Sequence, residues 1–223
     1  MSVLPLGLLP DTAEVSSSGS LRIGGLEVAG LADEWGTPLF VYDEEHLRSR
    51  CREAVAAFPD GVAYATKAFL CGAMARLAHE EGMLLDVATG GEIHVALASG
   101  VPADRLVFHG NNKSANELAY ALEAGVGRIV IDSMVEMDRI EALVGEGVRT
   151  PQVLVRVNPG VEAHTHEFLR TGATDSKFGI TIEGGAAAAA VERARTSTAM
   201  DLIGVHVHVG SQVFDVGSYE KAI

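Results

Sequence analysis

The sequence has 223 residues, of which 48% are hydrophobic and 21% are charged. That length is enough for one sizeable domain with a buried core, and the composition argues against disordered, collagen-like and disulfide-stapled chains. The formal net charge is −13, from 17 Lys and Arg against 30 Asp and Glu. So acidic a chain is not expected to bind nucleic acid.

Cysteine content and hydropathy bear on the compartment. The two cysteines, Cys51 and Cys71, have no metal-ligand spacing, so we expect neither a disulfide framework nor a metal site. No apolar run approaches the ~20 residues that span a bilayer, and the first residues lack the basic start of a signal peptide. These features predict a cytoplasmic protein with no membrane partner.

The first elements are expected to be short. Residues 1–20 end in the serine-rich stretch 16–20, which predicts a flexible arm. Residues 21–28 resemble a short strand. Asp43 is a typical N-cap, and the apolar residues after it recur at helical spacing as far as Phe58.

An alternation of strands and helices follows. Apolar runs lie at residues 62–66, 84–88, 106–109, 129–132, 153–157 and 202–209, and helix-like stretches include 73–81, 91–99 and 115–124. Fully apolar strands separated by helices are typical of a parallel sheet covered on both faces. The early repeat of about 20 to 25 residues suits a βα barrel, although a doubly wound open sheet uses similar units. A closed barrel needs eight such units. With about six, the chain is either an open sheet or an incomplete barrel.

Polar groups stand at the ends of these predicted strands. They are Lys67, Asp86, His109, Arg156, His206 and His208. Taken singly, each has an ordinary explanation, such as a surface lysine, a helix cap or a pair of core histidines. In a barrel, however, the carboxyl ends of the strands converge on one mouth. Because a lysine amine can form a Schiff base with a carbonyl, the joint arrangement favours a catalytic cavity.

Seven short motifs carry a resemblance to a known family. They are GTPLFVY at 36–42, YATKA at 64–68, DVATGGE at 86–92, GNNK at 110–113, RVNPG at 156–160, KFG at 177–179 and HVHVGSQ at 206–212. Their order and identity resemble the diaminopimelate decarboxylases. These belong to the fold-type III pyridoxal-phosphate (PLP) enzymes, with ornithine and arginine decarboxylases and alanine racemase. The resemblance extends over about residues 20–223.

The resemblance implies an α/β fold: a PLP-binding (β/α)8 TIM-like barrel followed by a C-terminal β-domain. Only about six βα units are present here, and the β-domain is lacking. Residues 1–35 would form an N-terminal arm and strand that pair with that domain, and residues 36–223 would form a partial barrel. We therefore expect an incomplete chain that does not decarboxylate by itself.

The resemblance also implies roles for individual residues. Lys67 would bind PLP covalently, and His208 would stack on the cofactor ring. Ser211 would contact the phosphate, and Asp86 and Arg156 would lie beside the cofactor.

Three further positions are assigned by the same resemblance. His109 and Asn111 would line the pocket, whereas Lys177 would lie near the subunit interface and the mouth of the active site. The implied oligomer is a homodimer of the full-length protein.

The implied reaction is the decarboxylation of meso-2,6-diaminopimelate to L-lysine, the last step of lysine biosynthesis. One alternative is a decarboxylase of the same fold that acts on ornithine, arginine or carboxynorspermidine. Another is a non-catalytic PLP-carrier protein, although such proteins complete a barrel within this length and lack the motifs at 177–179 and 206–212. An open-sheet binding module would leave Lys67 unexplained.

Overall fold

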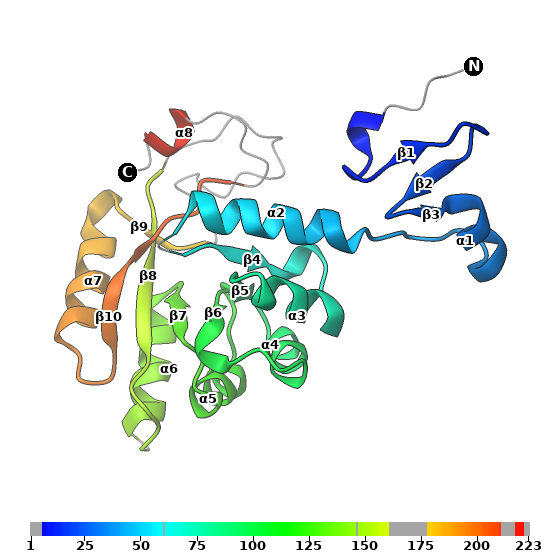
Figure 1. The fold of residues 1–223 in the computed structure, drawn as a ribbon. Coiled ribbons are helices and arrows are strands. Elements are labelled where there is room, and N and C mark those ends of the chain that lie inside the picture. Colours follow the sequence, from blue (N-terminus) through cyan, green and yellow to red (C-terminus); the bar gives the residue numbers. More distant parts are fainter. Residues whose placement is uncertain (1–5, 60, 146, 161–177, 211–216, 221–223) are drawn as a thin grey trace. The chain divides into compact units, whose positions relative to one another are not determined.

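The computed structural model describes residues 6–59, 61–145, 147–160, 178–210 and 217–220 (Figure 1). The chain divides into two compact units. The first comprises residues 1–62 with 80–83, and the second comprises residues 63–79 with 84–223.

A small antiparallel sheet begins the first unit, after a 3-10 turn η1 (Leu6–Leu8). Its strands are β1 (Glu14–Val15), β2 (Leu21–Ile23) and β3 (Leu26–Glu27), in the order β1-β2-β3. The serine-rich stretch is the turn between β1 and β2, where the Ser16 amide donates to the Ser20 carbonyl at 2.9 Å. The prediction of a flexible arm is therefore wrong for this part, because serine side chains and glycine suit tight turns as well as linkers.

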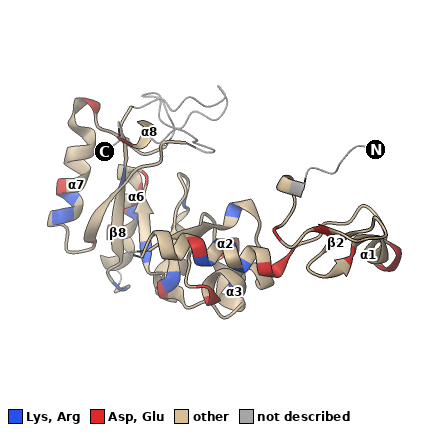
Figure 2. Ribbon diagram, turned by 45° about the horizontal axis from the view of Figure 1, so that its top comes forward, with Lys and Arg blue, Asp and Glu red and all other residues tan. Residues whose placement is uncertain are grey.

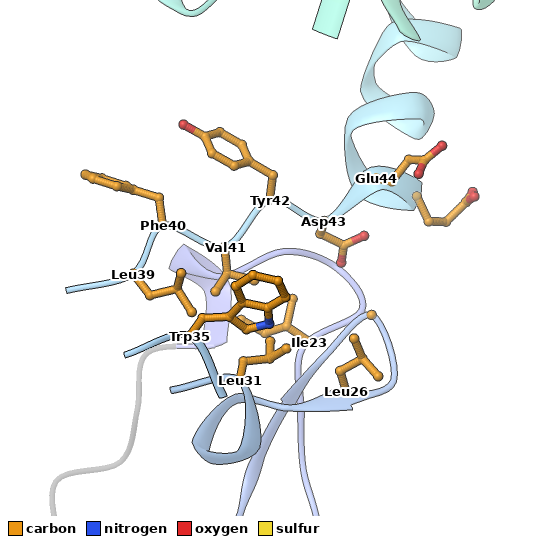
Figure 3. Close-up of a pocket in the computed structure, with 12 residues that line it drawn as sticks. Ile23, Leu26, Leu31, Trp35, Leu39, Phe40, Val41, Tyr42, Asp43 and Glu44 are labelled. Atoms are coloured by element: carbon orange, nitrogen blue, oxygen red, sulfur yellow. The ribbon is translucent and has the colours of Figure 1, made fainter. Parts of the chain in front are cut away.

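An apolar groove of about 500 Å³ lies on the surface of the first unit (Figure 3). Helix α1 (Val28–Trp35) contributes to it and buries none of its side chains. The single strand predicted at 21–28 is instead two antiparallel strands, β2 and β3, joined by a turn at Gly24 and Gly25, and helix α1 begins at Val28. Trp35 is 71% exposed and Phe40 is 87% exposed, so large apolar surfaces of this unit face solvent.

Helix α2 (Glu44–Ala57) begins as the sequence predicts. The Asp43 carboxylate accepts a hydrogen bond from the His46 amide at 3.0 Å and also one from the Thr12 hydroxyl. These bonds lower the pKa of Asp43. Figure 2 shows acidic and basic residues side by side along α2 and α7 (Ala186–Thr196), as expected for exposed helix faces.

The second unit is built on a parallel sheet. Its six successive strands are β4 (Ala63–Ala65), β5 (Leu84–Val87), β6 (Leu106–Phe108), β7 (Arg128–Ile131), β8 (Gln152–Asn158) and β10 (Asp201–His206). Each lies beside its predecessor, and β9 (Ile180–Thr181) adds to β8. A doubly wound sheet would reverse its strand order at a switch point, whereas a barrel wall advances in one direction. The prediction of a partial barrel is confirmed.

Helices and short 3-10 turns connect these strands. They are η2 (Thr66–Ala68), α3 (Gly72–Glu80), α4 (Gly90–Ala98), η3 (Ala103–Arg105), α5 (Ala115–Ala124), α6 (Met134–Gly145), η5 (Glu183–Gly185), α7 and α8 (Gly217–Glu220). The three helices predicted at 73–81, 91–99 and 115–124 agree to within one residue at either end. Helix α5 stops at Gly125 because this glycine adopts the left-handed conformation, with φ of 76°.

The core of the second unit lies between this sheet and its helices. Leu85, Leu106, Phe108, Ile129 and Ile131 are each 0% exposed. Burial of these side chains removes apolar area from water and is the main force that fixes the strand ends in space. Among the described residues, the helices are all too short or too polar to cross a membrane.

Candidate active site

The second unit contains a cavity of about 860 Å³ at the carboxyl ends of its strands. That volume lies within the range of about 300–1,000 Å³ typical of small-molecule sites. The cavity collects six of the eight site residues predicted from the sequence: Lys67, Asp86, His109, Asn111, Arg156 and His208. The other two, Lys177 and Ser211, lie outside the described residues.

Lys67 lies on η2, immediately beyond β4, and its side chain is exposed. Its position immediately beyond the strand agrees with the strand end predicted from the sequence. Two hydrogen bonds brace the short turn that carries it. The buried Thr66 hydroxyl donates to the Asp86 carbonyl at 2.8 Å, and the Tyr64 hydroxyl donates to the Phe69 carbonyl at 2.7 Å. The amine is thus presented to the cavity from a fixed backbone.

Asp86 and His109 are neighbours in the cavity lining, with 3.6 Å between Asp86 Oδ1 and His109 Nε2. Burial raises the pKa of Asp86 to about 6, although the positive charge of Lys67 opposes the rise. Burial also lowers the pKa of His109 to about 3, with smaller effects of His206, Lys113 and Arg156. At neutral pH the imidazole is therefore uncharged, and Asp86 titrates just below neutrality.

Two more imidazoles complete this side of the cavity. His206 ends β10 and His208 follows it, so both point into the same space, as the alternating sequence indicates. The ring centroids of His109 and His206 are 4.7 Å apart in an edge-to-face arrangement. Burial lowers the pKa of His206 to about 4 and lowers that of His208 as well. The Nδ1 atom of His206 is buried and has no hydrogen-bond partner among the described residues.

Arg156 lines the cavity from strand β8. Its Nη1 donates to Asp132 Oδ1 at 3.0 Å, and its guanidinium lies 4.8 Å from the centroid of the Phe178 ring. Sequence reasoning passed over Asp132, although it follows the apolar strand 128–131 in the same way that other site residues follow theirs. It also gave no role to Lys113 or Glu136, which form a buried ion pair of 2.7 Å beside Asp132.

Glu117 is a further lining residue that the sequence reasoning did not single out. Its carboxylate accepts hydrogen bonds from the amides of Gly90 and Ser114, each at 3.0 Å. These bonds lower the pKa of Glu117. The Ser-x-x-Glu spacing at 114–117 is a capping box and could have identified this residue. Glu117 thereby joins the start of α5 to the start of α4 at the cavity rim.

The residues present fit pyridoxal phosphate. An accessible lysine amine can react with the cofactor's aldehyde, and uncharged histidines offer flat faces to an aromatic ring. Gly110 allows close packing in the cavity, because a Cβ atom at this position would lie 3.0 Å from the Ala88 carbonyl oxygen.

Comparison with known proteins places this geometry in a family. Residues 44–223 match the family described as pyridoxal-dependent decarboxylase, pyridoxal binding domain. The diaminopimelate decarboxylase of Mycobacterium tuberculosis (strain ATCC 25618 / H37Rv) is 53% identical over 206 residues, which cover 92% of this chain and 46% of the relative. That of Bacillus subtilis (strain 168) is 45% identical over 219 residues, covering 96% and 50%. The chain thus spans about half the length of the curated relatives it matches.

Solved structures agree with the sequence matches. Diaminopimelate decarboxylase from M. jannaschii, in co-complex with L-lysine, superposes with a TM-score of 0.87 at 34% identity, covering 95% of this chain and 51% of that one. The Helicobacter pylori enzyme, complexed with L-lysine, gives a TM-score of 0.80 at 28% identity, covering 87% and 50%. The topology, the cavity and these matches agree, and the chain belongs to the pyridoxal-dependent decarboxylases, with residues 44–223 corresponding to their pyridoxal-binding domain.

Proposed function

We propose that the complete protein containing this chain decarboxylates meso-2,6-diaminopimelate to L-lysine and CO2, with pyridoxal phosphate as cofactor. The observation that carries this proposal is the convergence of Lys67, Asp86, Arg156 and His208 on one cavity. The choice of substrate is supported by the names of the relatives, including the 53% identical mycobacterial protein. The co-complex of the M. jannaschii protein with L-lysine also supports it.

Four residues of the cavity would hold the cofactor. Lys67 would bind it covalently through Nζ, and His208 would pack an uncharged imidazole against its ring. Asp86 and Arg156 would lie beside the ring and set the charge around it. When bound, pyridoxal phosphate supplies a conjugated ring that accepts the electron pair left behind as the carboxylate departs.

The protein's own groups handle binding and protons. Lys67 would hold the cofactor through Nζ, and its amine would be placed to transfer a proton at the same point of the cavity. Because the pKa of Asp86 is raised to about 6, its carboxyl can exchange a proton with a neighbouring amine near neutral pH. The low pKa of His109 keeps that imidazole uncharged, so it does not repel the substrate's ammonium groups.

The remaining assignments are proposals of the same kind. Ser211 contacts the cofactor phosphate, and His109 and Asn111 line the substrate space. Lys177 lies at the mouth, near the interface of a cytoplasmic homodimer.

Residues 1–35 are proposed to be an N-terminal arm that pairs with a C-terminal β-domain of the complete protein. The exposure of apolar side chains in this segment supports the pairing, as with Leu26, which is 58% exposed. Residues 36–223 then form the partial barrel that carries the cofactor.

The test uses the complete protein loaded with pyridoxal phosphate. Release of CO2 is measured with meso-diaminopimelate, ornithine, arginine and carboxynorspermidine as alternative substrates. We expect diaminopimelate alone to give rapid release, with L-lysine as the product. In parallel, borohydride reduction and peptide mapping should place a pyridoxyl group on Lys67.

The other outcomes separate the alternatives. Preference for ornithine, arginine or carboxynorspermidine would replace the proposed substrate while keeping the reaction. A pyridoxyl label on Lys67 with no release of CO2 from any substrate would indicate a carrier protein. Absence of any label would contradict the assignment of the cofactor to this cavity.

A further inference from the structure

Four charged side chains beside the cavity are almost completely buried. Lys113, Glu136, Asp132 and Arg156 are 2%, 3%, 5% and 8% exposed, respectively. Two are cations and two are anions, so the cluster is neutral as a whole. Charges at such depth are tolerated only when they are paired and hydrogen-bonded. Of the four, only Arg156 lines the cavity.

The Lys113 ammonium group has three close oxygen neighbours. Nζ lies 2.7 Å from Glu136 Oε1, and it donates to the carbonyl oxygens of Gly110 and Val130, each at 2.7 Å. It therefore connects the loop after β6 with β7 and with α6. Burial lowers the pKa of Lys113 and raises that of Glu136, and each partner opposes the shift of the other. The charge of each thus depends on the other's presence.

Asp132 connects the Lys113–Glu136 ion pair to Arg156 in the cavity. Glu136 Oε2 accepts from the backbone amide of Asp132 at 3.2 Å. Asp132 in turn accepts from Arg156 Nη1 on one carboxylate oxygen and from the Gly179 amide on the other, both at 3.0 Å. A continuous series of short contacts thus runs from Lys113 to the guanidinium of Arg156.

We infer that Lys113 and Glu136 are positioning residues that hold Arg156 in its place in the cavity wall through Asp132. Neither touches the cavity, so they act only through the backbone and the carboxylate that they fix. The importance of Arg156 for the reaction rests on the proposed function. The orientation of the Arg156 side chain is independent of that proposal and can be measured without cofactor or substrate.

The histidines of the cavity report where the Arg156 charge lies. Arg156 is among the charges that lower the pKa of His206 and of His208, whereas Lys113 is not. Lys113 does act directly on the pKa of His109, so that ring is not used as the readout. A rise in the pKa of both His206 and His208 is the expected sign that Arg156 has moved.

The test is an NMR titration of the histidine ring protons in the complete protein, before pyridoxal phosphate is added. Lys113→Met removes the charge and keeps the length of the side chain. We expect the pKa values of His206 and His208 to rise by about half a unit to one unit, because Arg156 is no longer held beside them. Glu141→Gln is the matched control. Glu141 lies on α6, as Glu136 does, and forms an ion pair of 2.7 Å with Arg193 of α7; neither residue lines the cavity, so breaking this pair should shift neither histidine.

A second variant covers the case in which a lone buried Glu136 prevents folding. Lys113→Met combined with Glu136→Met removes both charges together, and replacement of a whole buried ion pair by apolar groups is often neutral for stability. It leaves the Asp132 amide without its acceptor, so the histidine pKa values should still rise. Unchanged titration of His206 and His208 in the folded variants would overturn the inference, as would failure of both variants to fold. Shifted histidines in a protein that takes no pyridoxyl label would instead count against the proposed function alone.

Discussion

The groove of the first unit and the cavity of the second are both open hollows, but their linings differ. The groove, about 500 Å³, is lined chiefly by aliphatic and aromatic side chains, and the carboxylates at its end are engaged elsewhere (Figure 3). Asp43, for instance, caps α2. The cavity, about 860 Å³, brings a lysine, an aspartate, an arginine and three histidines together. The groove offers apolar area to bury, whereas the cavity offers groups that can transfer protons and bind anions.

The elements that carry the groove and the cavity also differ in how well they are packed. The strands that aim residues into the cavity are anchored by fully buried side chains such as Leu85 and Phe108. Helix α1 at the groove buries none of its residues. A site that must hold several groups in fixed geometry needs a packed scaffold behind it, and only the second unit supplies one.

The largest expected effect comes from Lys67. Lys67→Met removes the amine but keeps the chain length, so borohydride reduction should leave no pyridoxyl label on this peptide. Decarboxylation by the complete protein should fall by about a thousandfold or more, as is typical when a group that both bonds and transfers protons is lost. Peptide mapping and the rate of CO2 release measure the two losses.

The control for this variant is Arg195→Gln, which breaks an exposed ion pair with Glu192 on α7. It should retain both the label and the rate. If Lys67→Met kept the label elsewhere in the cavity, the assignment of the covalent site would be wrong.

A matched pair of leucines tests the difference in packing. Leu85 is 0% exposed on β5, and Leu26 is 58% exposed in the groove. Leu85→Ala should lower the free energy of unfolding by about 2–5 kcal/mol, because it leaves a cavity in the core. Leu26→Ala should cost less than about 1 kcal/mol. Urea unfolding of both variants gives the comparison. A large loss from Leu26→Ala would mean that the groove is covered in solution.

The pH dependence of stability should arise largely in the cavity. The pKa of His109 is lowered from an unfolded value near 6.5 to about 3, so the folded state excludes the proton that the unfolded state binds. The stability that it contributes is complete above pH 6.5 and is lost as pH falls toward 3. His109→Gln should therefore raise the free energy of unfolding by about 1–2 kcal/mol at pH 5 and leave it unchanged at pH 8.

Asp86 provides a control with the opposite pH dependence. Its pKa is raised to about 6, so its contribution is present below about pH 4 and is lost as pH rises through 6. Asp86→Asn should stabilise the protein by about 1–2 kcal/mol at pH 8 and not at pH 4. Thermal unfolding across this pH range measures both variants. Stabilisation that grows toward the same end of the pH range in both would contradict the burial of one of the two groups.

Much of this cavity could be predicted from the sequence, because its residues follow a local rule. Lys67, Asp86, His109 and Arg156 each stand in or at the end of an apolar run, and parallel strands bring such ends together. The capping of α2 by Asp43 and the left-handed Gly125 are likewise local, since each depends on only a few neighbouring residues.

The rest depends on contacts between distant segments. The pairing of Lys113 with Glu136 joins a loop to a helix one strand later, and no periodic pattern marks a buried ion pair. Lys67 is exposed because β4 ends at Ala65, and apolar composition alone does not predict a strand end to the exact residue. In the first unit, the serine-rich turn resembles a linker in composition and differs only in its backbone hydrogen bonds.

The smallest expected effect is spectroscopic and concerns the groove. Trp35 is the only tryptophan in the sequence and is 71% exposed, so its fluorescence reports this surface alone. In the 223-residue chain its emission should resemble that of a water-exposed indole, and acrylamide should quench it almost as well as in urea. Trp35→Phe supplies the blank. A blue-shifted, protected emission in the complete protein would show that another segment covers the groove there, whereas the same emission in the short chain would contradict the exposure of α1. The comparison of the two chains thus decides whether the apolar lining of the groove is a surface or an interface.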